Sequence, residues 1–248
     1  MLRIVSWNIR AGGGKRADGI IRQLTDWQPD IIALSEFRAT QASCWIAAQL
    51  DSHGFTHQRC TTDSENPAVN ALLLASRWPI RIIKNKHAPA NKNRWLHVNI
   101  HGPVTIAVMA MHIPNRSTGL KTPFLESVAE LVKHWRGPPA VLIGDTNSGC
   151  IDIDEESQAF NHTEDQWIKN LNHLQWRDAF RLLHGDKREF TWYSPNGRNG
   201  FRLDQAFIHP SLHTSIKQFR HEWGGQPNSY RQCLSDHAAI IVDLDYPI

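Results

Sequence analysis

Polar clusters suited to the hydrolysis of a phosphate ester end several apolar runs of this chain. In the last third, Asp204 closes a stretch that begins at Phe201, and Ser235-Asp236-His237 precedes the final apolar run. A carboxylate beside an imidazole fixes its tautomer and supports the positive charge that a phosphorane-like transition state favours. We therefore predict that Asp204 and His237 form a catalytic pair and that Asp236 lies beside a metal or the attacking water.

The tetrapeptide Gly144-Asp145-Thr146-Asn147 follows a strongly apolar run in the middle of the chain. Glycine permits a tight turn at the end of a strand, and the alternation of side chains places Asp145 and Asn147 on the same side. Asp145 can hold or deprotonate an attacking water, and Asn147 can donate a hydrogen bond to a phosphate oxygen. An Asx turn that caps the strand is the structural alternative.

Four further candidates end apolar runs in the first half of the chain: Asn8, Glu36, His112 and Asn115. Glu36 offers a hard carboxylate oxygen, and waters can complete the octahedral shell of a Mg²⁺ ion held there. His112 and Asn115 can donate hydrogen bonds to non-bridging phosphate oxygens. A lone glutamate or histidine in such a place is usually a solvated or structural residue, so the shared position at strand ends carries the interpretation.

Trp192 and Phe201 flank a polar loop and are candidates for contact with a nucleic acid. Aromatic side chains at the edge of a site stack on bases or insert into a duplex. A core position of Trp192 is the alternative for this residue. Arg202 is a candidate phosphate contact, with a solvated surface position as its alternative.

The elements that must position these residues alternate along the chain. Helical periodicity and caps predict helices over 18–27, 39–53, 123–135 and 163–174. Apolar runs predict strands over 2–7, 30–35, 55–60, 70–75, 80–86, 95–100, 104–111, 140–143, 190–193, 203–208 and 238–244. Helices early in each half, with hairpin-like strands after them, indicate two mixed sheets packed face to face with helices outside, a layered α/β sandwich. Without repeats or a linker, residues 1–248 are expected to form a single domain.

The composition of the chain indicates which partners and which cellular location to expect. A net charge of +3 and an isoelectric point of 8.7 mildly favour a polyanion such as DNA, without the strongly basic surface of a dedicated nucleic-acid binder. No secretory signal and no apolar run of membrane-spanning length is visible, so we expect no membrane partner and a cytoplasmic location. Four scattered cysteines without a Cys-x-x-Cys pair favour reduced thiols over a disulfide framework or a zinc site.

The ordered motifs resemble those of the endonuclease/exonuclease/phosphatase superfamily, and within it most closely the exonuclease III type of apurinic/apyrimidinic endonuclease. The resemblance runs from about residue 2 to residue 244. The motifs that carry it are Ser6-Trp7-Asn8, Leu34-Ser35-Glu36, Pro114-Asn115, Gly144-Asp145-Thr146-Asn147, Phe190-Thr191-Trp192, Gly200-Phe201-Arg202-Leu203-Asp204 and Ser235-Asp236-His237. It implies a four-layer α/β sandwich and phosphodiester hydrolysis that depends on Mg²⁺ or Mn²⁺.

The resemblance also implies roles for individual residues. Glu36 resembles the main metal ligand and Asn8 its neighbour, while Asp236 resembles a carboxylate near the metal. Asp145 resembles the residue that positions or activates the nucleophile, and Trp192 stands where DNA-cleaving members have an aromatic at the sugar pocket.

Asn147 further resembles an amide that contacts the phosphate, and Asp204 with His237 resembles the carboxylate–histidine pair. Two positions depart from the repair enzymes: His112 replaces a tyrosine, and Arg10 replaces a small polar or acidic residue. These departures bear on abasic-site specificity rather than on hydrolysis.

We therefore expect a metal-dependent DNA nuclease that takes part in DNA repair, acting as a monomer without an obligate protein partner. Endonuclease and exonuclease action both remain open at this point. A phosphoesterase acting on a small-molecule or lipid phosphodiester is the second interpretation, because it would keep the same catalytic residues and change only the loops. A catalytically silent binding module on the same scaffold is the third. The joint presence of several carboxylates and a histidine pair argues against it.

Overall fold

The first of two six-stranded sheets contains both ends of the chain. The computed structural model describes residues 1–196, 198–225 and 233–246. In this sheet the order is β13-β14-β1-β2-β4-β3, and only β1 and β2 run parallel to each other. Its strands are β1 (Leu2–Asn8), β2 (Ile31–Phe37), β3 (His57–Cys60), β4 (Ala71–Ser76), β13 (Ile216–Glu222) and β14 (Ala239–Leu244).

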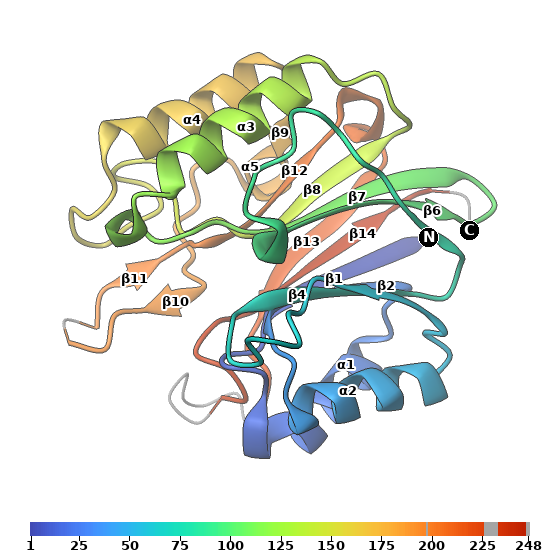
Figure 1. The fold of residues 1–248 in the computed structure, drawn as a ribbon. Helices are drawn as coiled ribbons and strands as arrows, with labels where there is room; N and C mark the ends of the chain where they lie inside the picture. Colours follow the sequence, from blue (N-terminus) through green and yellow to red (C-terminus); the bar gives the residue numbers. More distant parts are fainter. Residues whose placement is uncertain (197, 226–232, 247–248) are drawn as a thin grey trace.

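The second sheet has the order β5-β6-β7-β8-β12-β9, with β7 and β8 as its parallel pair. Its strands are β5 (Ile80–Ile82), β6 (Trp95–His101), β7 (Thr105–His112), β8 (Ala140–Asp145), β9 (Arg177–Asp178) and β12 (Asp204–Ile208). A separate two-stranded ribbon consists of β10 (Trp192–Tyr193) and β11 (Gly200–Phe201). In Figure 1 this ribbon projects from one end of the sandwich.

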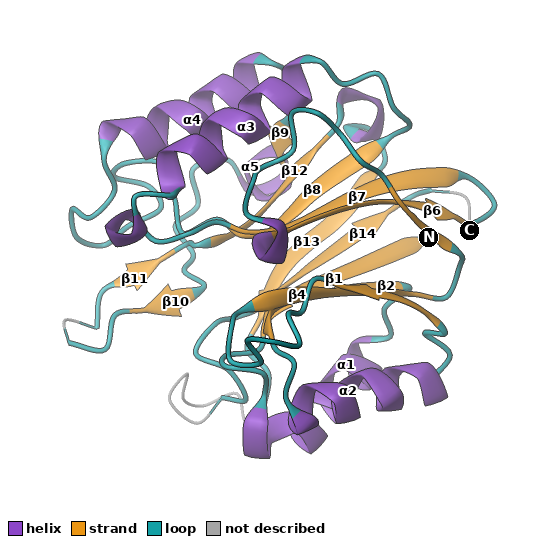
Figure 2. Cartoon of the chain, in the orientation of Figure 1, coloured by secondary structure: helices purple, strands orange, loops and turns teal. Residues whose placement is uncertain are grey.

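Helices cover the outer faces of the two sheets, which gives four layers (Figure 2). The helices α1 (Ala17–Trp27) and α2 (Gln41–Ser52) pack on the first sheet through one apolar cluster. The helices α3 (Lys121–Lys133) and α4 (His162–His173) pack on the second sheet through another. A short helix, α5 (Ala179–His184), follows β9 and contributes to the core between the sheets. The expected four-layer α/β sandwich is therefore confirmed.

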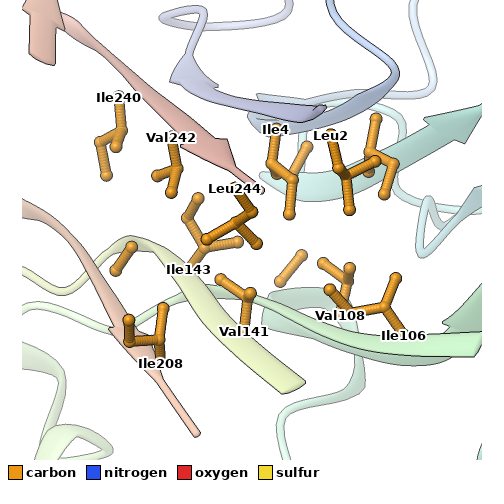
Figure 3. Packing of buried hydrophobic residues seen from close by; sticks show 14 of the residues in the cluster. Leu2, Ile4, Ile106, Val108, Val141, Ile143, Ile208, Ile240, Val242 and Leu244 are labelled. Atoms are coloured by element: carbon orange, nitrogen blue, oxygen red, sulfur yellow. The ribbon is translucent and has the colours of Figure 1, made fainter. Parts of the chain in front are cut away.

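The largest apolar cluster lies between the sheets and holds them face to face. Figure 3 shows β1 and β14 side chains, such as Ile4 and Val242, opposite Val108 of β7 and Ile143 of β8. These residues alternate with outward-facing ones along each strand, as a sheet buried on both faces requires. Burial of this apolar surface is the main force that fixes the distance between the sheets.

Local sequence signals explain where the helices begin and end. The Thr40 side chain caps α2 by accepting a hydrogen bond from the Ser43 N–H (3.4 Å). Asn161 and Glu164 form a reciprocal capping box at the start of α4. Gln28 adopts a left-handed conformation that ends α1. The capping side chains at the helix starts, and the Gln28 N–H that donates to the Thr25 carbonyl, satisfy backbone groups that a helix end leaves unpaired.

Most predicted elements are confirmed, and the differences have physical reasons. The strand expected over 80–86 ends at residue 82, and the helix expected over 123–135 begins at residue 121. Neither β13 nor α5 was predicted. The former is a polar edge strand with little apolar alternation, and the latter is only six residues long. Within the described residues, no helix is long and apolar enough to cross a membrane.

Candidate active site

Strand register brings three predicted residues into one row at an edge of the second sheet. His112 of β7 pairs with Asp145 of the parallel strand β8, and Asp145 pairs with Asp204 of the antiparallel strand β12. The row therefore combines the last residues of β7 and β8 with the first residue of β12. Residues in register on adjacent strands point to the same face of the sheet. All three side chains are buried.

The first sheet presents its own polar residues at the facing edge. Asn8 ends β1, and its Nδ2 donates a hydrogen bond to Oδ2 of Asp145 (3.0 Å). The same Nδ2 lies 3.5 Å from Oε1 of Glu36 in β2. The Asn8 carboxamide thus connects the two sheets at the point where the proposed metal and water ligands meet.

The backbone at Glu36 departs from regular strand geometry. Register between β2 and β4 shifts between Ser35 and Phe37, and Glu36 has a φ of 56°. The Ala11 N–H donates a hydrogen bond to Oε2 of Glu36 (2.7 Å). A β-bulge redirects a side chain relative to the strand, and a non-glycine residue at positive φ persists only when its surroundings hold it. The bulge therefore gives the Glu36 carboxylate a fixed orientation at the sheet edge.

Asp204 and His237 form the predicted pair, with Nδ1 of His237 2.9 Å from Oδ2 of Asp204. Burial alone would lower the pKa of His237, but the charge and hydrogen bond of Asp204 outweigh it and raise the pKa to about 10. Trp7 Nε1 donates to the carbonyl of His237 (2.9 Å), and the Ser235 hydroxyl donates to the carbonyl of Asn8 (2.6 Å). These bonds anchor the histidine segment to the end of β1.

Asp145 is the carboxylate that the site encloses most completely. Its Oδ1 accepts a hydrogen bond from the Asn147 N–H (3.0 Å), and Oδ2 lies 3.5 Å from Nε2 of His112. Burial raises the pKa of Asp145, which the nearby His112 and His237 partly oppose. Burial also lowers the pKa of His112 to about 4. His112 is therefore neutral near pH 7 and acts as a hydrogen-bonding group rather than as a charge.

The donor set fits a divalent cation with a preference for oxygen ligands. Carboxylate oxygens of Asp145 and Asp204 lie within 4.8 Å of each other and of a ring nitrogen of His237. Glu36 and Asp236 line the cleft together with Asp145. Glu36, Asp145 and Asp236 bring three carboxylates to one cleft, a concentration of negative charge that a divalent cation would neutralise. Hard oxygen donors of this kind suit Mg²⁺ or Mn²⁺.

A cleft of about 400 Å³ opens over these residues. Its walls include the polar side chains of Asn115 and Asn147 and the aromatic rings of Trp192 and Phe201. The Trp192 ring is only half-buried, so its predicted place at the site edge agrees with the structure better than a core position does. Asn147 Nδ2 already donates one hydrogen bond to the Ile113 carbonyl (2.8 Å), which leaves its second N–H for another acceptor.

A model of the Endonuclease/Exonuclease/phosphatase family matches residues 5–237, a stretch that contains every site residue named above. The chain belongs to this family. This match confirms the predicted superfamily, whose members are hydrolases of phosphate esters. A search of curated proteins gave no significant match.

Solved structures of this family share the fold over almost the whole chain. A 3′ phosphatase from Neisseria, bound to a product DNA hairpin, is 21% identical with a TM-score of 0.79. An AP endonuclease from Archaeoglobus fulgidus is 20% identical with a TM-score of 0.82, and a 3′–5′ exonuclease from Neisseria meningitidis is 21% identical with a TM-score of 0.78. Each alignment covers 99% of this chain and 100% of the other.

The prediction that Arg202 contacts a phosphate is wrong. Its side chain is completely buried and does not line the cleft. The guanidinium donates to both carboxylate oxygens of Asp154 (2.7 and 3.0 Å) and to Oδ2 of Asp178 (2.6 Å). A loop arginine is ordinarily solvated, and its two acidic partners lie 48 and 24 residues away in the sequence. Arg202 instead holds the segment before α4 against the second sheet.

Sequence reasoning also missed part of the cleft wall. Lys121, Glu164 and Phe160 line the cleft, although none of them follows an apolar strand. Arg116 lines it as well. The segment that contains Phe160 had no assigned role because its polar composition gives no periodic signal. Only the folded chain shows that α3 and α4 bring these residues to the site.

Proposed function

We propose that this protein is a divalent-metal-dependent phosphodiester hydrolase that acts on DNA. The observation that carries the proposal is the placement of Asp145, which is bonded to Asn8 of the opposite sheet and lies in the cluster with Asp204 and His237. One cleft would therefore combine a site for a cation, a carboxylate that orients the attacking water and a protonated histidine that stabilises charge on the phosphate.

Asn8, Glu36 and Asp236 are the residues that would hold Mg²⁺ or Mn²⁺, with Glu36 as the main ligand. A bound divalent ion supplies Lewis acidity, which polarises a phosphoryl oxygen and stabilises a leaving oxygen. Glu36 is suited to this role because the Ala11 N–H and the β-bulge fix its carboxylate. Asp236 is half-exposed, and Arg10 Nε lies 3.7 Å from its carboxylate.

The protein's own groups would orient water and stabilise charge on the phosphate. Asp145 accepts a proton from, or orients, the attacking water, and burial raises its pKa, which makes it a stronger base than an exposed aspartate. His237 has Nδ1 engaged by Asp204, so Nε2 is left to donate to a non-bridging oxygen. Asn147 and neutral His112 add hydrogen bonds without adding charge.

The cleft wall favours a nucleic acid over a small ester. Trp192 and Phe201 are in ring contact, with centroids 5.9 Å apart, and Phe160 meets Phe201 at the same distance. Aromatic surfaces stack on bases and exclude water around a sugar. Arg116 adds a half-exposed cation to the wall. The solved relatives include an AP endonuclease and a 3′ phosphatase bound to DNA, which supports DNA as the substrate class.

We infer that residues 1–248 act as one domain, supported by the apolar core that both sheets share. A role in DNA repair, a cytoplasmic location and a monomeric state without an obligate protein partner stay predictions.

The test is cleavage of end-labelled DNA that is intact, carries one abasic site or ends in a 3′ phosphate. Each substrate is incubated with Mg²⁺, with Mn²⁺ or with EDTA, and Asp145→Asn is the control for contaminating nucleases. We expect metal-dependent turnover that the variant lacks, and the ratio among the three substrates identifies the preferred lesion. Turnover of bis(p-nitrophenyl) phosphate with no turnover of any DNA would overturn DNA as the substrate and favour a small phosphodiester.

A further inference from the structure

Glu164 is a buried carboxylate at the wall of the cleft that joins three separate segments. Its side chain accepts hydrogen bonds from Lys121 at the start of α3 and from Arg116 (2.6 Å) in the preceding turn. It also accepts one from the Asn161 N–H (2.9 Å) within its own capping box. Glu164 and Lys121 are only 1% and 5% exposed, so water does not screen the pair.

Lys121 connects Glu164 to Asn147, which lies in the loop directly after β8. Its ammonium donates a second hydrogen bond to the backbone carbonyl of Asn147. Asn147 has a φ of 47°, a left-handed conformation that asparagine adopts more readily than other residues with a side chain. Its N–H bonds to Asp145 and its Nδ2 bonds to the Ile113 carbonyl, so Lys121 provides the third constraint.

We propose that the Lys121–Glu164 pair is a positioning device that holds Asn147 in the conformation from which its amide reaches the substrate phosphate. The proposal rests on the proposed function and adds residues that act through Asn147 rather than on the substrate. Glu164 fixes the ammonium of Lys121, and the ammonium fixes the carbonyl of Asn147.

A role in protein stability alone explains the buried Lys121–Glu164 pair less well than a positioning role does. Burial lowers the pKa of Lys121, which shows that the ammonium is kept out of water at a cost. Replacing buried ion pairs by apolar residues is often neutral or favourable for stability, so folding alone gives little reason for this pair. Its hydrogen bond to the backbone of Asn147, whose side chain lines the cleft, gives a specific one.

The experiment is a double-mutant cycle on single-turnover cleavage of the preferred DNA substrate, with Lys121→Met and Asn147→Ala made singly and together. Lys121→Met keeps the length of the side chain and removes its donors. We expect it to lower the cleavage rate about 10- to 100-fold, the size of effect that a small misplacement of an active-site group produces. Because Lys121 acts through Asn147, the same change in the Asn147→Ala background is expected to lower the rate less than about threefold.

Three further variants separate positioning from folding. Lys121→Arg restores a charged donor and is expected to recover most of the rate. Glu164→Gln keeps an acceptor and is expected to show a smaller loss than Lys121→Met. The exposed pair Lys133 and Glu130 on the same helix is the matched control, since Nζ and Oε1 lie 3.1 Å apart at the surface. Lys133→Met is expected to leave the rate unchanged.

Multiplicative losses in the double variant would overturn the proposal, because they would mean that Lys121 acts independently of Asn147. An unchanged rate in both Lys121→Met and Glu164→Gln would overturn it as well. If Lys121→Met does not fold by circular dichroism, Glu164→Gln replaces it in the cycle with Asn147→Ala. Full activity of Asn147→Ala alone would instead count against the role of Asn147 in the proposed function, which keeps the two failures apart.

Discussion

The pairing of Asp204 with His237 leads to a quantitative prediction about the titration of the histidine. Replacing Asp204 by Asn removes the charge that keeps His237 protonated, whereas the burial that opposes protonation remains. The rise in the pKa of His237 from 6.5 to about 10, at about 1.4 kcal/mol for each unit of pKa, corresponds to about 5 kcal/mol. In Asp204→Asn we therefore expect the pKa of His237 to fall by about two units or more.

The same shift links stability to pH with a definite sign. The folded-state pKa lies above the unfolded value of about 6.5. The stabilisation from this histidine is therefore complete below pH 6.5 and is lost as the pH rises towards about 10. The stability advantage of the wild-type protein over Asp204→Asn should accordingly shrink by several kcal/mol, and by at most about 5 kcal/mol, across this range.

Two measurements check this reasoning in the presence of EDTA. Nuclear magnetic resonance of the His237 imidazole gives its titration, and urea denaturation at pH 6, 8 and 10 gives the free energy of unfolding. Glu189→Gln is a matched control, because Glu189 pairs with a different buried histidine, His221, at 2.9 Å. That variant should leave the His237 titration unchanged. A wild-type His237 that titrates near 6.5, or a stability difference independent of pH, would refute the argument.

Two further predictions concern the metal and the buried arginine. Glu36→Gln should weaken Mn²⁺ binding at least about tenfold in isothermal titration calorimetry, because the variant loses a charged oxygen ligand, while the circular dichroism spectrum stays unchanged. Arg202→Met should lower the free energy of unfolding by about 3–5 kcal/mol, because it leaves the carboxylates of Asp154 and Asp178 buried without their partner. Urea denaturation measures this loss, and a change below about 1 kcal/mol would contradict the structural role of Arg202.

The sequence predicts the sheet edge well because the relevant signal is local. Each of Asn8, His112 and Asp145 ends a strand whose apolar residues mark it clearly, and the family motifs surround them. Once two parallel pairs of strands are assumed, their carboxyl ends must meet at shared edges. The row of His112, Asp145 and Asp204 then follows from register.

Arg202 shows why orientation is harder to predict than position. It lies two residues before Asp204, within a motif that points to the site, yet its side chain is fully buried and does not line the cleft. Its orientation depends on Asp154 and Asp178, which come from separate segments of the fold. No local pattern connects these three residues, and an arginine outside a regular element is ordinarily exposed. The error therefore came from applying a composition rule where a long-range ion pair decides.

The geometry of the site also depends on long-range contacts, because it combines residues of both sheets. Asp145 belongs to the second sheet, but its Oδ2 receives a hydrogen bond from Asn8 of the first sheet at 3.0 Å. The distance between these residues is set by the apolar side chains that separate the sheets, among them Ile4 and Ile143 (Figure 3). Protein interiors transmit changes in packing because they are close-packed. A cavity in this core would therefore displace the Asn8 and Asp145 side chains relative to each other. The packing between the sheets thus determines the geometry from which Asp145 can orient the attacking water.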